Sequence, residues 1–290
     1  MIPSACTHLV SCYTSYSMQI KPETAWIFDV DGVLSDPEHK TIDERFFEII
    51  FQKLEEGEPV ALNTGRSIDW VIEKMIHPIQ KKIKNKSDIS RFFVVGEKGA
   101  TWMSLDAMGN MHRDRNDSFI LSHELRERMK EMVEEKFSDC VFFDDTKETM
   151  ISIEMKDSYD VEKFKHRQKE LNSEMKKIIK EIGNGHKMDP TIIATDIEDV
   201  RVGKAIGTKR ILTWLESNKL TPEKFIAFGD SVSDLEMADE LEKKGKQVTF
   251  VYVGDPEKLK KAEEEGKVKN KAIIDEVGGF TKGTLRYLTR

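Results

Sequence analysis

The chain has 290 residues, a formal net charge of −7, 38% hydrophobic residues and 34% charged residues. This length and composition are typical of a globular protein with one large domain or two ordinary ones. The acidic balance argues against nucleic acid as a general partner, and no run of about 18 apolar residues exists that could span a membrane.

Residues 1–22 are rich in Ser, Thr and Tyr and lack the basic start and the apolar run of a signal peptide. We expect them to form a loosely ordered N-terminal tail on a cytoplasmic protein. Cys6, Cys12 and Cys140 fit neither a disulfide framework nor a zinc site, so we expect free thiols in a reducing compartment.

Short, nearly continuous apolar runs predict buried strands of a parallel sheet whose two faces are covered by helices. These runs are Ala25–Val30, Pro59–Asn63, Arg91–Gly96, Phe225–Phe228 and Gln247–Val253. Apolar residues at helical spacing lie between them, in Glu44–Leu54, Ile68–Ile79, Ile211–Leu215 and Leu235–Leu241. The alternation predicts a doubly wound α/β core, with a parallel sheet, made of residues 23–110 and 203–290.

Residues 111–202 interrupt this alternation. Charged helices are predicted over Ser122–Lys136 and Val161–Ile182. Strands are predicted over Cys140–Phe143, Thr149–Met155, Thr191–Thr195 and Glu198–Val202. The order α-β-β-α-β-β predicts a small α+β domain with both helices on one face of an antiparallel sheet. Since core-type strands resume after it, we interpret it as an inserted cap domain.

Two carboxylates, Asp29 and Asp31, directly follow the first predicted strand, and Gly32 allows the chain to turn sharply after it. Ligands of open α/β sheets bind at the carboxyl ends of the strands, so a substrate can reach this pair. Two close carboxylates can divide the work of nucleophile and general acid–base. They can also hold a hard cation such as Mg²⁺ through oxygen. An acidic strand-to-helix turn without catalytic role is the alternative.

Two more turns follow predicted core strands. At the first, the Thr64 hydroxyl, the Gly65 backbone and the Arg66 guanidinium can bind phosphoryl oxygens. At the second, Asp230 and Asp234 can complete a metal site, or one of them can cap the helix that follows.

A phosphoryl group beside several carboxylates requires cations, which a metal ion and a lysine can supply. Lys209 and Lys204 are the candidate lysines. We prefer Lys209, because it opens the apolar-periodic segment Ile211–Leu215 and is expected at a helix start facing the site. The choice between the two lysines stays open at this point.

Four segments resemble, in order, the four motifs of the haloacid dehalogenase-like phosphatase superfamily: Asp29–Val33 (DVDGV), Thr64–Arg66 (TGR), Lys209, and Gly229–Asp234 (GDSVSD). The resemblance covers about Ala25 to Leu288. Ser233 replaces the usual Asn of the fourth motif, and Lys209-Arg210 replaces the frequent Lys-Gly of the third.

The insertion lies between the second and third motifs, as does the C2-type cap of one subgroup. That subgroup includes sucrose-phosphate, trehalose-phosphate and Cof-type sugar phosphatases, and phosphomannomutases. Gly96–Ala100 (GEKGA) is similar to its Glu-Asn-Gly-Ala-like strand end, with Lys98 in place of Asn, and Gly279–Thr284 resembles its closing segment.

The resemblance implies a role for each motif residue. Asp29 is the nucleophile, and Asp31 is the general acid and base. Thr64 and Lys209 hold the phosphoryl oxygens. Further phosphate or substrate contacts are expected from Gly32, Gly65, Arg66 and Lys98. Mg²⁺ is the implied cofactor, with ligands from Asp29, the Asp31 carbonyl, Asp230 and Asp234.

The function that these implications favour is Mg²⁺-dependent hydrolysis of a small phosphomonoester, above all a sugar phosphate. A phosphomutase and a non-catalytic binding protein with the same fold are the alternatives. We expect a small phosphorylated metabolite as partner, no nucleic acid and no membrane, and a monomer or homodimer. In the cap, Lys147, Lys187, His186 and Glu154 are candidates to face the core and select the substrate.

Overall fold

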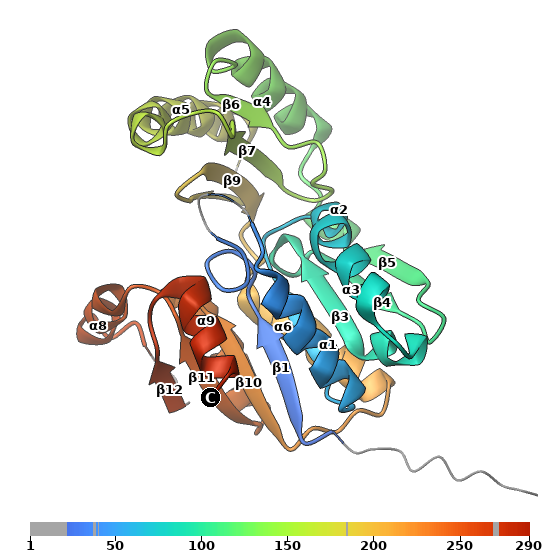
Figure 1. Cartoon of the computed structure of the whole chain (residues 1–290). Coiled ribbons are helices and arrows are strands. Elements are labelled where there is room, and N and C mark those ends of the chain that lie inside the picture. Colours follow the sequence, from blue (N-terminus) through green and yellow to red (C-terminus); the bar gives the residue numbers. More distant parts are fainter. Residues whose placement is uncertain (1–21, 37–38, 40, 184, 269–272) are drawn as a thin grey trace, which may run out of the picture.

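The computed structural model describes residues 22–36, 39, 41–183, 185–268 and 273–290. The predicted tail up to residue 21, with Cys6 and Cys12, lies outside the described residues. Two sheets organise the rest of the chain, an eight-stranded one in the core and a four-stranded one in the cap. Figure 1 shows the cap, in green and yellow, standing over the core.

The core sheet has the strand order β12-β11-β10-β1-β2-β3-β4-β5. Its strands are β1 (Thr24–Phe28), β2 (Val60–Asn63), β3 (Phe92–Gly96), β4 (Thr101–Leu105), β5 (Met111–Arg115), β10 (Lys224–Gly229), β11 (Gln247–Tyr252) and β12 (Ile273–Glu276). Strands from β12 to β3 are parallel neighbours, which confirms the doubly wound parallel core. The five predicted parallel strands all occur, and they are mostly buried because helices cover both faces of the sheet.

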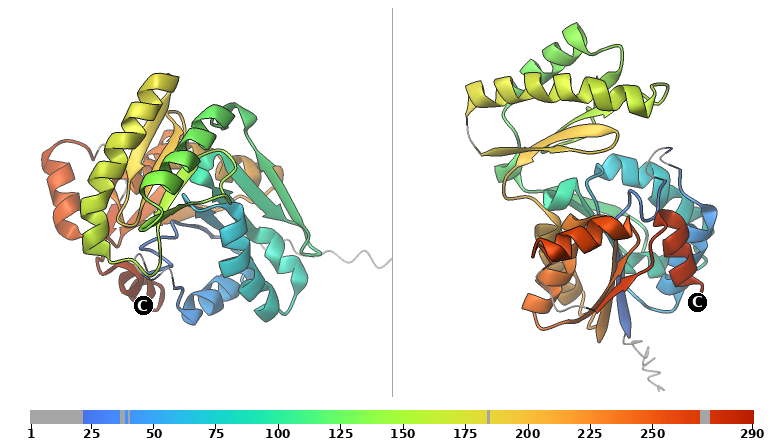
Figure 2. Two further views of the ribbon diagram at one scale, coloured as in Figure 1. Left: turned by 90° about the horizontal axis from the view of Figure 1, so that it is seen from above. Right: turned by 90° about the vertical axis from the view of Figure 1, so that its left-hand side faces the viewer.

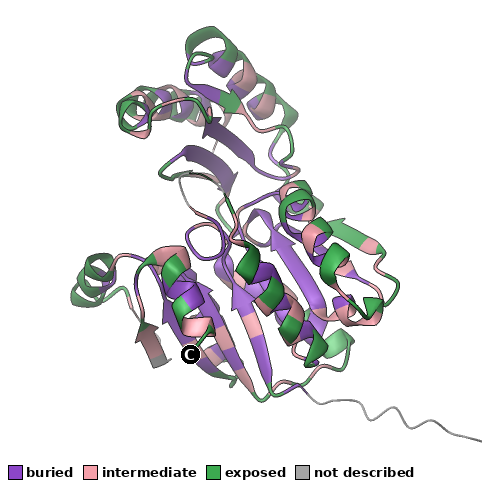
Figure 3. Ribbon diagram, viewed as in Figure 1, coloured by how far each residue is buried: buried purple, intermediate pink, exposed green. Residues whose placement is uncertain are grey.

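Helices α1 (Glu44–Glu55), α2 (Ile68–Val71), α3 (His77–Lys82) and α9 (Phe280–Leu288) pack on one face of the core sheet. Helices α6 (Lys204–Ser217), α7 (Leu235–Lys243) and α8 (Pro256–Glu264) pack on the other. Figure 3 shows the buried strands between these two layers. Among the helices in the described part of the chain, none is both long and apolar enough to cross a membrane.

The helix predicted over Ile68–Ile79 is interrupted by a wider π-type turn at Ile72–Ile76, between α2 and α3. Pro78 stands at the start of α3. A proline inside a helix cannot donate a backbone hydrogen bond, and its ring crowds the preceding turn. The wider turn directly before Pro78 relieves that conflict.

The antiparallel pair β4–β5 extends the core sheet beyond β3. Met111–Arg115, which the sequence alone placed at the start of the insertion, forms β5 and pairs with β4. The chain therefore crosses from the core sheet to the cap after Arg115. The side chains of β5 are largely exposed, so its sequence shows little alternation of apolar and polar residues. The sequence pattern therefore did not predict this strand.

The cap sheet has the order β6-β7-β9-β8, and every neighbouring pair is antiparallel. Its elements are α4 (His123–Lys136), β6 (Val141–Phe143), β7 (Ile151–Met155), α5 (Val161–Ile182), β8 (His186–Pro190) and β9 (Ala194–Asp199). Both helices lie on the face of the sheet that points away from the core (Figures 1 and 2). The predicted order α-β-β-α-β-β is confirmed.

The last two cap strands were predicted at the wrong residues. The predicted strand Thr191–Thr195 contains the turn between β8 and β9, where the Ala194 N–H donates to the Thr191 hydroxyl at 3.0 Å. The predicted strand Glu198–Val202 begins near the end of β9. Apolar content misled the prediction, since β8 is an edge strand with few apolar residues and needs no buried face.

A two-residue turn after β3 fastens the cap to the core. Glu97 and Lys98 both have left-handed backbone conformations, with φ of 46° and 53°. Such values are rare for side chains of this size and persist only where surrounding contacts stabilise them. The buried Glu97 carboxylate accepts hydrogen bonds from the N–H groups of residues 148–150 and from the Thr149 hydroxyl, at 2.6–3.2 Å. These donors belong to the cap, in the segment before β7.

Replacing Glu97 by Gln is expected to lower the free energy of unfolding by about 1–3 kcal/mol, because charge-assisted hydrogen bonds in a buried site are lost. Urea denaturation measures the change. The control is Glu148→Gln, which removes a more exposed cap–core ion pair with Arg115 at 2.8 Å and is expected to cost below about 1 kcal/mol. Equal effects of the two substitutions would contradict a special role for Glu97.

Candidate active site

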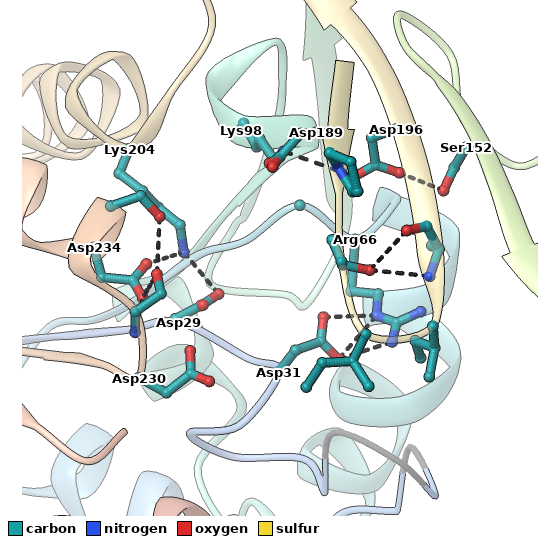
Figure 4. Close-up of a pocket in the computed structure, with 18 of the residues that line it drawn as sticks. Asp29, Asp31, Arg66, Lys98, Ser152, Asp189, Asp196, Lys204, Asp230 and Asp234 are labelled. Atoms are coloured by element: carbon teal, nitrogen blue, oxygen red, sulfur yellow. Dashed lines mark hydrogen bonds and ion pairs between the residues drawn. The ribbon is translucent and has the colours of Figure 1, made fainter. Parts of the chain in front are cut away.

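A cleft of about 630 Å³ lies between the carboxyl ends of the core strands and the cap strands β7 to β9. The core contributes carboxylates and cations to its wall, among them Asp29, Asp31, Arg66, Lys98, Lys204, Asp230 and Asp234. The cap contributes Lys147, Ser152, Glu154, Asp189, Asp196 and the turn Pro190–Ala194. Figure 4 shows the labelled core and cap side chains within this cleft.

Three carboxylates converge at the ends of the neighbouring parallel strands β1 and β10. Oxygen atoms of Asp29, Asp230 and Asp234 all lie within 4.8 Å of one another. Gly32 permits this approach, because a Cβ at that position would stand 2.3 Å from a carboxylate oxygen of Asp230, and its φ is 75°. The sequence correctly predicted that these acids lie together at one edge of the sheet.

Lys204 is the lysine that reaches this cluster. Its Nζ lies 2.8 Å from an Asp29 oxygen and 2.8 Å from an Asp234 oxygen, and it donates to the Asn63 carbonyl at 2.7 Å. Burial alone would lower the pKa of Lys204, but the charges of Asp234 and Asp29 outweigh it and raise that pKa. The ammonium is therefore charged.

The prediction that Lys209 opens a helix and faces the site is wrong. Helix α6 begins at Lys204, and the Lys209 side chain is 57% exposed and points to Glu240 at 3.9 Å. Ile206 is the one large apolar residue in the segment 204–210 of α6, so a regular apolar pattern starts only at Ile211. A Cβ at Gly207 would stand 2.1 Å from the Asn63 side chain, which shows how closely this turn packs on β2.

The carboxylate cluster carries more negative charge than Lys204 balances. Burial raises the pKa of Asp29 to about 7 in spite of the opposing charge of Lys204, and the charge of Asp234 adds to the rise. Burial, Asp234 and Asp29 together raise the pKa of Asp230 to about 8. Three carboxylates and one ammonium in a buried place favour an additional cation. Hard oxygen donors are the ligands that Mg²⁺ takes in proteins, so the side chains of Asp29, Asp230 and Asp234 fit that ion.

Asp31 points away from this cluster and toward Arg66. The Arg66 guanidinium donates from Nη2 to Oδ1 at 2.8 Å and from Nε to Oδ2 at 2.9 Å. Partial burial would raise the pKa of Asp31, but the charge and hydrogen bonds of Arg66 outweigh it, and the pKa is lowered. The two acids after β1 are thus in different electrostatic environments, as a division of labour requires.

The second motif lies at the end of β2. Thr64 is fully buried, and its hydroxyl accepts a hydrogen bond from the Arg66 N–H at 3.1 Å. The Gly65 carbonyl lines the cleft and accepts from the Lys147 ammonium of the cap at 2.5 Å. The hydroxyl of Thr64 therefore stabilises the turn, and its predicted contact with a phosphoryl group stays a prediction.

Lys98 reaches the cap instead of the carboxylate cluster. Its Nζ lies 2.5 Å from Asp189, 2.8 Å from Glu198 and 3.7 Å from Asp196. The predicted role of Lys98 in phosphate binding stays untested, but the ammonium is surrounded by cap carboxylates. It thus contributes directly to cap docking.

Of the four cap candidates, Lys147 and Glu154 line the cleft. His186 and Lys187 lie on the edge strand β8, and Lys187 donates to the Val202 carbonyl at 2.7 Å. Sequence reasoning missed Ser152 and Asp196, which are joined by a hydrogen bond of 2.6 Å. Alternation along β7 and β9 could have found them, because Ile151, Ile153 and Ile197 belong to the apolar cap core and the residues between them point the other way.

Comparisons with known proteins agree with this architecture. The family model described as haloacid dehalogenase-like hydrolase matches residues 26–245. No curated protein sequence matches the chain.

Similar solved structures share the fold at low sequence identity. The C-terminal domain of Candida albicans trehalose-6-phosphate phosphatase has a TM-score of 0.57 at 12% identity, covering 86% of this chain and 79% of its own. Thermoplasma acidophilum 0175 has a TM-score of 0.53 at 17% identity, covering 92% and 97%. Plasmodium falciparum IMP-nucleotidase has a TM-score of 0.52 at 18% identity, covering 82% and 62%.

The family match spans most of the chain, and it runs through the β1 carboxylates, the whole inserted cap and the β10 carboxylates. The cap lies between the second and third motifs, as the C2-type resemblance implied, and it has the element order that the sequence pattern predicted. This chain belongs to the haloacid dehalogenase-like hydrolase family, with a C2-type cap, and is a hydrolase.

Proposed function

We propose that this protein is a Mg²⁺-dependent phosphatase that hydrolyses a small phosphomonoester, most fittingly a sugar phosphate, through an aspartyl-phosphate on Asp29. The observation that carries the proposal is the surroundings of Asp29. Its carboxylate lines a cleft, contacts the Lys204 ammonium at 2.8 Å and lies among further carboxylates suited to a metal ion. A phosphatase nucleophile requires this combination of access, positive charge and orientation.

In the first step, a carboxylate oxygen of Asp29 attacks phosphorus, and the bond from phosphorus to the leaving oxygen breaks. The leaving oxygen takes a proton from the Asp31 carboxyl. In the second step, Asp31 removes a proton from water, the water oxygen attacks phosphorus, and the bond to Asp29 breaks. Inorganic phosphate leaves and both carboxyl groups return to their starting states.

Lys204 supports both steps by holding the Asp29 carboxylate in place and by opposing the negative charge of the phosphoryl group. When bound to Asp29, Asp230 and Asp234, Mg²⁺ would neutralise phosphoryl oxygens and orient the group for attack. Preorganised charges of this kind are usually the largest contribution to the rate.

The wall opposite the phosphoryl end of the cleft supports a hydroxyl-bearing substrate. Ser152, Glu154 and Asp196 offer mainly hydrogen-bond acceptors there, and each is buried. We favour hydrolysis over the phosphomutase alternative, because the family model that matches this chain describes hydrolases. Trehalose-6-phosphate phosphatases and an IMP-nucleotidase, which share the fold, are named for monophosphate substrates. A cytoplasmic location and a monomeric or dimeric state stay predictions.

Asp29→Asn is expected to reduce phosphate release by roughly 10³-fold or more, because the amide cannot act as nucleophile. Release of phosphate from 4-nitrophenyl phosphate and from a panel of sugar phosphates measures the effect, with circular dichroism confirming the fold. Near-normal turnover by a folded Asp29→Asn variant would rule out the aspartyl-phosphate.

Lys204→Met is expected to lower kcat by about 10²-fold, because a charge that stabilises the transition state is removed from a buried site. The matched control is Lys209→Met in the same helix, whose exposed side chain should change kcat less than about twofold. The kinetics of both variants decide the question that the sequence left open. If Lys209→Met were the inactive one, the placement of the site would be wrong.

Removal of divalent metal by EDTA is expected to abolish turnover, and Mg²⁺ should restore it. Asp230→Asn should raise the Mg²⁺ concentration that gives half-maximal rate by about tenfold or more, because the substitution removes one of the proposed metal ligands. Titration of the metal-free protein with Mg²⁺, followed by calorimetry and by rate, tests both statements. Full activity in EDTA would contradict them.

A further inference from the structure

We propose that Arg66 is a positioning residue that orients the acid–base carboxylate of Asp31 and makes this orientation depend on the docked cap through Glu154. The inference rests on the proposed phosphatase function and goes beyond it. It assigns a specific task to a guanidinium that sequence comparison alone would treat as one more phosphate contact.

The core half of the arrangement is a two-point contact. Arg66 follows β2, and it approaches both oxygens of Asp31 in a fork. A planar fork fixes the plane of a carboxylate as well as its distance, which a single hydrogen bond does not. A further hydrogen bond to this carboxylate, among the residues that the structure describes, comes from the Ser35 hydroxyl at 3.2 Å. Since the Asp31 side chain is 38% exposed to the cleft, Arg66 is the main restraint on its direction.

The cap half is an ion pair at the opposite edge of the same guanidinium. Its Nη1 lies 3.4 Å from a carboxylate oxygen of Glu154 on β7, and both side chains are 8% exposed. The guanidinium also stands over the Trp70 ring of α2, 5.0 Å from its centre. The core therefore sets the plane of the group, and the cap supplies its second carboxylate. Arg66 is the bridge between Asp31 and Glu154, which are 123 residues apart in the chain.

This bridge has a mechanical consequence. With the cap docked, Arg66 has a carboxylate on each side and is confined between them. With the cap undocked, Glu154 moves away with β7, and the guanidinium keeps only its core contacts. Acid–base chemistry by Asp31 is then best organised when the cleft is closed and water is excluded from it.

A phosphate-binding role for Arg66 makes a different prediction. A phosphate ligand acts on every ester alike, so its loss slows all of them in proportion. A residue that positions a general acid acts most on esters whose leaving group must be protonated. Nitrophenolate leaves readily without a proton, whereas phenolate benefits much more from one.

The experiment compares 4-nitrophenyl phosphate with phenyl phosphate, with Mg²⁺ present, for Arg66→Lys, Arg66→Met and Glu154→Gln. Arg66→Lys keeps the charge but loses the fork. For both Arg66 variants we expect kcat/KM, which reports the first step alone, to fall about 10²-fold on phenyl phosphate, and below about tenfold on 4-nitrophenyl phosphate. Glu154→Gln should show the same selectivity with a smaller loss. If Arg66→Met does not fold, Arg66→Lys carries the test.

The matched control is Glu148→Gln, which breaks another carboxylate–arginine contact between cap and core, with Arg115 at 2.8 Å, outside the cleft wall. It should leave the ratio of the two rates unchanged. In the double variant Arg66→Lys with Glu154→Gln, the loss should not exceed that of Arg66→Lys alone, since both changes act through one contact.

Equal losses of kcat/KM on both esters would overturn the positioning role and assign Arg66 to phosphate binding. Additive losses in the double variant, or a Glu148→Gln variant that behaves as Glu154→Gln does, would overturn the link through the cap. Failure of the proposed function is recognised separately, because the unaltered protein would then release phosphate from neither ester, and the inference would fall with it.

Discussion

The concentration of negative charge at the ends of β1 and β10 is the constraint on which the rest of the site depends. Parallel pairing of these strands puts Asp29 beside the loop that carries Asp230 and Asp234. Carboxylates this close and this buried repel one another, and the raised pKa values of Asp29 and Asp230 express that cost. The buried ammonium of Lys204 offsets part of this repulsion, and the arrangement of the carboxylate oxygens fits a hard cation. The site is arranged to receive positive charge before any substrate arrives.

Charged and polar groups also form contacts at the boundary between cap and core. Polar contacts join the cap to the core: Glu97 binds backbone N–H groups, Lys98 lies among cap carboxylates, and Lys147 donates to the Gly65 carbonyl. Polar interfaces of this kind separate at a smaller cost than apolar ones, because water can replace each partner. Gly65, Lys98 and Lys147 also line the cleft, so the contacts that hold the cap border the proposed substrate site.

The sequence predicted correctly those parts of the molecule whose place in the fold leaves a local sequence pattern. Core strands with two covered faces are continuous apolar runs, and Asp29, Asp31, Asp230 and Asp234 stand where such runs end. The sequence pattern favoured Lys209 over Lys204 as the lysine of the site. The start of α6 packs on β2 through Gly207 and polar atoms, so no apolar periodicity marks Lys204 as the start of the helix. The strands β8 and β9 were shifted because an edge strand with polar side chains resembles a loop. The pairing of Arg66 with Glu154 joins segments 88 residues apart and has no local signal at all.

The two carboxylates after β1 now have distinct physical identities. Asp29 lies in the crowded cluster, where burial and like charges raise its pKa and Lys204 opposes that rise. Asp31 lies across the turn, where Arg66 lowers its pKa and directs its oxygens toward the cleft. A lowered pKa keeps Asp31 ionised, which in the proposed mechanism is the state that accepts a proton from water in the second step and not the state that donates one in the first. The charge of an incoming phosphoryl group, close to both acids, opposes that lowering and makes protonation of Asp31 easier. In the proposed mechanism, substrate binding thus supplies part of the electrostatic change that the first step requires, and departure of inorganic phosphate after the second step reverses it.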